Sequence, residues 1–245
     1  MPVDHFGDDV AATYDESLGE MSEPATIAAT VAFLTDLAGN GGALELGIGT
    51  GRVALPLAER GVAVHGIDLS TAMVEQMRAK PGGDAIPVTI GDFATTRLDR
   101  RFALAYLLFN TINNLTTQDE QVACFCNVAE HLRPGGRFVI EVGVPGLQWL
   151  PPGERFQPFS VTPEHVGIDE YDVANQGLIS HHYTRGADGR YEVVSMPFRY
   201  AWPAELDLMA RIAGLRRVER WSSWTREPFT SDSRQHISVW QKPAA

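Results

Sequence analysis

The sequence lacks the features of a membrane, secreted or nucleic-acid-binding protein. No run approaches the ~18 apolar residues of a membrane span, and the start Met1-Pro-Val-Asp-His5 has no signal-peptide pattern. With 31 acidic against 20 basic residues, the formal net charge of -11 would repel a phosphate backbone. We therefore expect a cytoplasmic protein without membrane or nucleic-acid partners, and whether it is a monomer or a homodimer stays open.

Cysteine is also scarce, and the two cysteines are not placed to form a disulfide or to share a metal ion. Cys124 and Cys126 lie two positions apart in a helical pattern, where side chains do not face each other. We expect free thiols rather than a disulfide, and no metal site. The chain shows no internal repeat, and its 44% hydrophobic content supplies a globular core.

Strand and helix patterns alternate along residues 24–143 at the spacing of βαβ units. Short apolar runs predict strands at 43–46, 62–67, 86–90, 102–108 and 138–142. Such alternation predicts an α/β fold with a doubly wound parallel sheet. A helix at 52–60 contains Pro56, which should remove a backbone hydrogen bond and bend it.

The pattern changes after the fifth strand. Residues 144–163 hold five prolines and are predicted to be a loop, with His165 on a loop surface beyond it. Residues 168–202 alternate as antiparallel strands do. A helix at 203–213 and two strands at 216–222 and 236–241 close the chain.

A glycine-rich turn, Glu45-Leu-Gly-Ile-Gly-Thr-Gly51, joins the first strand to the next helix. Glycines permit positive φ and let a ligand lie against bare backbone. The carboxyl end of a strand is where open α/β sheets bind ligands. By itself such a turn is weak evidence, because any tight strand-to-helix connection can use glycine.

Two acids end the next two strands. Asp68 can accept hydrogen bonds from vicinal ribose hydroxyls, or it can assist the start of the following helix. Combined with the glycine turn, ribose binding is favoured. Asp92 can accept from an exocyclic amine while Phe93 packs on a purine, but taken by itself this pair is better explained as a turn aspartate followed by a core phenylalanine.

Glu45 bears on the kind of ligand. Dinucleotide-binding turns have the spacing Gly-x-Gly-x-x-Gly and aim a helix N-terminus at a pyrophosphate. Here the glycines stand at 47, 49 and 51, and the Glu45 carboxylate would repel a pyrophosphate. It suits the ammonium and sulfonium groups of S-adenosylmethionine, so a nicotinamide-dependent oxidoreductase is the less favoured alternative.

Four segments together resemble the successive motifs of class I S-adenosylmethionine-dependent methyltransferases. They are Ala43–Arg52, Gly66–Ser70 with Met73, Gly91–Phe93 and Leu132–Phe138. The resemblance covers roughly residues 40–143. It implies a Rossmann-like seven-stranded sheet whose last strand is antiparallel, together with S-adenosyl-L-methionine as the cofactor.

The resemblance also implies a cofactor site. Glu45 and the glycine backbone would surround the methionine part, Asp68 would hold the ribose, and Asp92 would sit at the adenine. Tyr14 is similar to a lid tyrosine of such enzymes. The residues assigned to the cofactor are Tyr14, Glu45, Gly47, Ile48, Gly49, Gly51, Asp68, Leu69, Met73, Asp92, Phe93 and Leu108.

The acceptor side is less defined. Methyl transfer is an in-line displacement that needs a base only when the nucleophile arrives protonated. The catalytic candidates are Tyr14, Asn110, His181 and His182, although Asn110 lies in a segment that can equally form a turn and cap. The two histidines are neighbours on a predicted strand, so at most one faces a given pocket.

Four further residues either line an aromatic acceptor pocket or pack in the core: Trp149, Arg199, Tyr200 and Trp202. The Asp/Asn-Pro-Pro-Tyr/Phe signature of nucleic-acid adenine and glutamine methyltransferases is absent, which counts against those substrates.

The antiparallel region resembles the lid insertion of small-molecule methyltransferases, including amino-sugar N-methyltransferases. We expect one domain over residues 1–245, whose parts are a helical lid at 1–40, a cofactor core at 41–143, a loop and antiparallel lid insertion at 144–202, and a C-terminal helix with two strands at 203–245. The expected activity is methyl transfer to N or O of a small-molecule acceptor. A protein of this fold that binds the cofactor without methylating remains an alternative.

Overall fold

The structure is a computed structural model of the chain, and it describes residues 6–17, 23–186 and 188–244. The helices are α1 (Asp8–Ser17), α2 (Pro24–Ala38), α3 (Ala54–Glu59), α4 (Thr71–Arg78), α5 (Gln118–His131) and α6 (Pro203–Ile212). The strands of the main sheet are β1 (Ala43–Leu46), β2 (Val64–Asp68), β3 (Val88–Ile90), β4 (Phe102–Leu107), β5 (Leu132–Gly143), β10 (Arg216–Trp221) and β11 (Gln235–Gln241). A second sheet holds β6 (Phe156–Val161), β7 (His165–Asp172), β8 (Gly177–Arg185) and β9 (Tyr191–Arg199).

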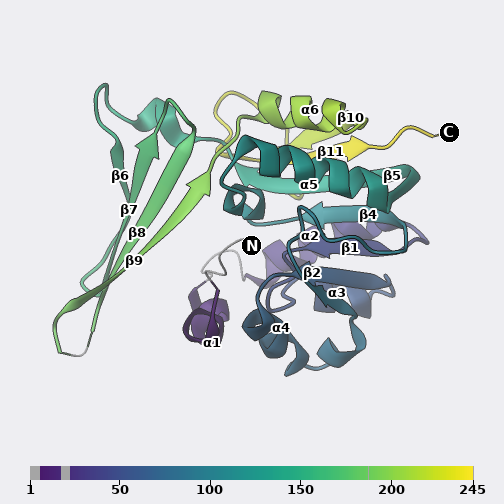
Figure 1. Cartoon of the computed structure of the whole chain (residues 1–245), viewed down its shortest axis with the longest axis horizontal. Helices are drawn as coiled ribbons and strands as arrows, with labels where there is room; N and C mark the ends of the chain where they lie inside the picture. Colours follow the sequence, from purple (N-terminus) through teal and green to yellow (C-terminus); the bar gives the residue numbers. More distant parts are fainter. Residues whose placement is uncertain (1–5, 18–22, 187, 245) are drawn as a thin grey trace.

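The main sheet has the order β10-β11-β5-β4-β1-β2-β3. Strands β1 to β5 run parallel, whereas β11 is antiparallel to both β5 and β10. This arrangement confirms the expected α/β sheet with its last strand antiparallel. Figure 1 shows the helices around this sheet and the second sheet standing to one side.

Burial of both faces explains the apolar composition of the central strands. All six residues of β4 are buried, as expected for a strand covered by helices on both sides. One apolar cluster joins the sheet to α5 and α6, and another joins it to α2, α3 and α4. No helix among the described residues is both long and apolar enough to cross a membrane.

The predicted loop at 144–163 is wrong in part, because β6 lies inside it. Pro158 belongs to β6, where the register with β7 shifts between Pro158 and Ser160. β6 is the edge strand of its sheet, and an edge position tolerates proline because one side of the strand is unpaired. His165 is also not a loop residue, since it begins β7 and is half-buried.

The expected bend at Pro56 also needs correction. α3 begins at Ala54, so Pro56 is its third residue. The first four backbone N–H groups of a helix have no intrahelical partner, and proline there sacrifices no helical hydrogen bond.

A buried polar cluster fastens the second sheet to the core. Arg199, at the end of β9, pairs with Glu205 of α6 at 2.7 Å and donates to Gln121 Oε1 of α5 at 2.6 Å. The amide of Gln121 donates in turn to the carbonyls of Ile112, Leu115 and Arg199. Arg199 therefore acts in packing rather than as an acceptor-pocket residue.

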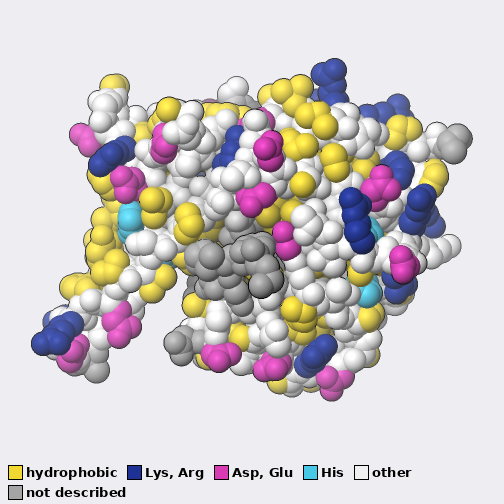
Figure 2. Space-filling view, in the orientation of Figure 1, with side chains coloured by type: hydrophobic (Ala, Val, Ile, Leu, Met, Phe, Trp, Pro, Cys, Tyr) yellow, Lys and Arg dark blue, Asp and Glu magenta, His cyan; other side chains and the backbone are white. Residues whose placement is uncertain are grey.

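Much of the second sheet is exposed and apolar. Figure 2 shows hydrophobic side chains along it, and those with at least two-fifths of their surface exposed are Phe156, Phe159, Val161, Tyr191, Val193 and Val194.

Candidate active site

Two adjoining cavities open at the carboxyl ends of β1, β2 and β4. The larger cavity is lined by Phe6, Tyr14, Gly47, Gly49, Asp68, Leu69, Ser70, Met73, Asp92, Phe93, Thr111, Asn114 and Leu115. The smaller cavity is lined by Tyr14, Glu45, Gly47, Ile48, Gly49, Thr50, Arg52, Val53, Leu108, Phe109 and Thr111. Every residue assigned to the cofactor from the sequence lines one of the two cavities, except Gly51.

The glycine turn forms the wall shared by both cavities. Gly47, Gly49 and Gly51 have φ of 68°, 55° and 76°, a region that side chains rarely adopt. A Cβ on Gly47 would lie 2.8 Å from Thr111 Cγ2, and one on Gly49 would lie 3.3 Å from Met73 Cε. The bare backbone thus leaves a cradle that side chains would fill.

Asp68 stands at the end of β2 with its carboxylate tied to the backbone. Its Oδ2 accepts from the Gly49 amide at 2.6 Å, and its Oδ1 accepts from the Ser70 amide at 2.9 Å. Ser70 is the N-cap of α4, and its Oγ accepts from the Met73 amide. Asp68 therefore supports the glycine turn and the start of α4 while also lining the larger cavity.

Glu45 is buried at the base of the smaller cavity. The Tyr106 hydroxyl donates to its Oε2 at 2.9 Å. Burial raises the pKa of Glu45 to about 8, while the Tyr106 bond and the charge of Arg52 act in the opposite direction. An acidic side chain, Glu45, and a cationic one, Arg52, thus line the same cavity.

Asp92 and Phe93 follow β3 and line the larger cavity. Asp92 Oδ1 accepts from the Ala94 amide at 2.8 Å, and Oδ2 accepts from Thr95 Oγ1 at 3.3 Å. Phe93 is buried in the apolar cluster beneath α5. The turn and core roles considered for this pair are thus present, and they are compatible with a position at the cavity wall.

The N-terminal segment covers the cavities: Phe6, which precedes α1, lines the larger cavity, and Tyr14 of α1 lines both. The Thr50 hydroxyl donates to Asp15 Oδ1 at 2.6 Å, and Lys80 Nζ pairs with Asp15 Oδ2 at 2.5 Å. Burial raises the pKa of the Tyr14 phenol, so the phenol stays protonated at neutral pH. Residues 1–5 and 18–22 of the helical lid expected at 1–40 lie outside the described residues.

Asn110 does not line either cavity. Its Oδ1 accepts from the Gly143 amide at 2.7 Å, which ties the segment after β4 to the end of β5. The following turn of 3-10 helix, Thr111–Asn114, supplies lining residues instead. Thr111, Asn114, Leu115, Ser70 and Arg52 were missed from the sequence, although all lie within or beside motifs that it contains.

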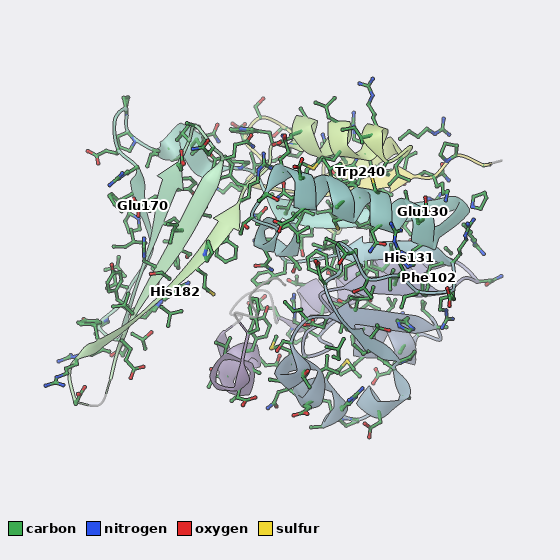
Figure 3. The ribbon with its side chains drawn as sticks, viewed as in Figure 1. Phe102, Glu130, His131, Glu170, His182 and Trp240 are labelled. Carbon is green, nitrogen blue, oxygen red and sulfur yellow. The ribbon has the colours of Figure 1, made fainter. Side chains whose placement is uncertain are left out.

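His181 and His182 lie on β8 of the second sheet and line neither cavity. Figure 3 shows His182 on that sheet. The two histidines do point to opposite faces. His181 contacts Glu170 Oε2 at 3.3 Å and Ser195 Oγ at 2.8 Å, whereas His182 Nδ1 lies 3.1 Å from His165 Nε2. A catalytic role for either residue remains a prediction.

A separate open cavity lies at the other end of the parallel strands, near the start of β4 and the end of α5. It is lined by Arg97, Leu98, Asp99, Arg100, Arg101, Glu130 and His131. His131 Nε2 accepts from the Leu98 amide, and its Nδ1 contacts the Asn127 carbonyl (Figure 3). Both ring nitrogens are thus used within the fold, and the cavity has no connection to the glycine turn.

Comparison with known proteins agrees with this geometry. Residues 43–136 match the model of a methyltransferase domain family. The solved structure of the CcbJ methyltransferase from Streptomyces caelestis is 38% identical, with a TM-score of 0.87 over 98% of both chains. The chain belongs to the class I S-adenosylmethionine-dependent methyltransferases.

Two curated methyltransferases are also similar. The cypemycin N-terminal methyltransferase of a Streptomyces species is 28% identical over 204 residues, which are 81% of this chain and 82% of the relative. The dTDP-3-amino-3,4,6-trideoxy-alpha-D-glucopyranose N,N-dimethyltransferase of Streptomyces venezuelae is 29% identical over 150 residues, which are 61% of this chain and 58% of the relative.

Proposed function

We propose that this methyltransferase transfers the methyl group of S-adenosylmethionine to an amine nitrogen of a small molecule. The observation that carries the cofactor part is that buried Glu45 and Arg52 line one cavity beside the glycine cradle. An amino acid moiety carries an ammonium and a carboxylate, and this cavity offers one partner for each.

Each wall of the site has a proposed role. Glu45 binds the ammonium group, Arg52 binds the carboxylate, and the Gly47 and Gly49 backbone lies along the methionine chain. Asp68 accepts from the ribose hydroxyls. Leu69, Met73, Asp92 and Phe93 enclose the adenine. When bound, the cofactor supplies an electrophilic methyl group on a sulfonium.

The lack of a strong base favours nitrogen over oxygen as the acceptor atom. The titratable side chains that line the two cavities in the described chain are Tyr14, Glu45, Arg52, Asp68 and Asp92. A hydroxyl acceptor would have to lose its proton to a base, and burial makes the Tyr14 phenol a poor one. A neutral amine brings its own lone pair and needs only alignment and exclusion of water.

Two further observations support a small amine acceptor. One of the two similar curated methyltransferases is named for methylation of an N-terminus, and the other is named as an N,N-dimethyltransferase of an amino sugar. The net charge of -11 disfavours a nucleic acid and favours a cationic molecule.

Turnover with matched acceptor panels tests the proposal. Small amines, including amino sugars and short peptides with free N-termini, are incubated with S-adenosylmethionine, and S-adenosylhomocysteine formation is measured beside phenols and alcohols. We expect turnover with amines and none with hydroxyl compounds. Exclusive turnover of hydroxyl acceptors would overturn the choice of nitrogen. Calorimetry that shows binding of NADH but not of S-adenosylhomocysteine would overturn the cofactor assignment.

A further inference from the structure

The chain enters a strained conformation where β4 reaches the smaller cavity. Phe109 and Asn110 have φ of 57° and 58°, and they are the only two consecutive non-glycine residues with positive φ in the described chain. Asparagine tolerates this region, but a bulky aromatic residue there is a true outlier. Such strain persists only when the surroundings hold it in place.

Glu141 of β5 is one of the groups that hold it. Its Oε2 accepts from the Phe109 amide at 3.2 Å, and its Oε1 accepts from Trp224 Nε1 at 2.8 Å. The Asn110 side chain adds a second tie to β5 through the Gly143 amide, and the Asn110 amide donates to the Glu141 carbonyl at 3.2 Å.

The turn bears directly on the reaction site. Phe109 lines the smaller cavity together with Glu45 and Tyr14, and the Arg52 guanidinium lies 5.5 Å from the centre of its ring. Glu141 itself lines neither cavity, but the backbone amide that it accepts from belongs to Phe109, which does.

We infer that Glu141 is a positioning residue for methyl transfer, because it holds the Phe109–Asn110 turn so that the Phe109 ring fixes the geometry of the cavity in which donor and acceptor meet. This inference rests on the proposed function for the identity of the acceptor. A misplacement of ~1 Å at such a site can cost ~100-fold in rate.

Glu141→Gln tests the inference because an amide offers one acceptor oxygen to two donors. Either the Phe109 amide or the Trp224 indole then faces an NH₂ group. Trp224→Phe is the matched control, since it removes only the indole donor while the ring still packs on Phe33. In Glu141→Gln/Trp224→Phe the single amide oxygen is again available to Phe109.

Hydrogen exchange of the peptide that contains the Phe109 amide reports the turn without any acceptor, and S-adenosylhomocysteine affinity is measured in parallel. For Glu141→Gln we expect exchange at least ~10-fold faster, kcat lower by ~10- to 100-fold with an amine that the wild type methylates, and a smaller change in affinity. Trp224→Phe stays near wild type, and the double variant regains most of the lost kcat.

Unchanged exchange and kcat in Glu141→Gln would overturn the inference. A double variant as impaired as Glu141→Gln would also overturn it, because the charge of Glu141 rather than its bond to Phe109 would then matter. If Glu141→Gln does not fold, hydrogen exchange in two other variants decides instead. We expect the Phe109 amide to stay protected in the double variant and to exchange faster in Asn110→Ala. Failure to find any amine acceptor would count against the proposed function alone, since exchange needs no acceptor.

Discussion

Glu45 should release a proton when the cofactor binds. Its pKa of about 8 means that the unliganded protein holds Glu45 mostly protonated at neutral pH. An ammonium group placed beside it would favour the carboxylate, as any nearby opposite charge does. Cofactor binding and ionisation of Glu45 are therefore linked, and the affinity should depend on pH.

The size of the effect follows from the pKa. If Glu45 is ionised in the complex and titrates at about 8 without ligand, the affinity for S-adenosylhomocysteine rises ~25-fold between about pH 6 and pH 7.5. S-adenosylhomocysteine is the suitable probe because it keeps the ammonium group but lacks the sulfonium. The histidines with a lowered pKa, His65, His131, His182 and His236, line neither cavity.

Titration calorimetry in two buffers of different ionisation enthalpy measures the affinity for S-adenosylhomocysteine and the number of protons released on binding. We expect release of nearly one proton at about pH 6.5 and a fall in Kd as the pH rises. Glu45→Gln is the control, because it preserves an acceptor for Tyr106 and cannot ionise. It should bind more weakly than the wild type at about pH 7.5 and lose most of the pH dependence. Equal affinities at both pH values, with no proton released, would refute the reasoning.

The same group links stability to pH. The folded-state pKa lies above the unfolded value of 4.5, so between these values the folded state holds one proton more and stability falls as the pH rises. The wild type should lose about 2 kcal/mol between about pH 6 and pH 8 through this group. Glu45→Gln should escape that loss, and chemical denaturation without ligand at the two pH values checks it.

Three other substitutions test separate parts of the structure. Asp68→Ala should weaken S-adenosylhomocysteine binding by ~10- to 100-fold in calorimetry, because charge-assisted bonds worth ~1.5–3 kcal/mol disappear, and unchanged affinity would contradict the ribose assignment. Lys80→Met should speed S-adenosylhomocysteine release several-fold in stopped-flow fluorescence because α1 loses its tie through Asp15, and an unaltered rate would show that α1 does not cover the site. Thr117→Ala breaks the capping box of α5 and should cost ~1 kcal/mol, or ~2–4 °C in Tm, with cofactor affinity unchanged.

The parts of the site that the sequence predicted are those with local causes. The glycine turn and Asp68 each follow a strand within their own βα unit, so their position after successive parallel strands places them at the same carboxyl end of the sheet. One error has the opposite origin. β6 could not be predicted in a proline-rich segment because its edge position, which tolerates Pro158, is decided by pairing with β7.

The same distinction explains why the Phe109–Asn110 turn was missed as a structural feature. Asn110 alone attracted attention from sequence, as an amide beside the expected methyl position. What fixes the turn is an acid 32 residues later and an indole 83 residues beyond that, and no local pattern relates them. An acid within the apolar strand predicted at 138–142 was nevertheless a visible signal, because a carboxylate costs free energy in a core unless donors meet it. Glu141 accepts from two donors, and one of them is the backbone amide of Phe109, whose φ is positive.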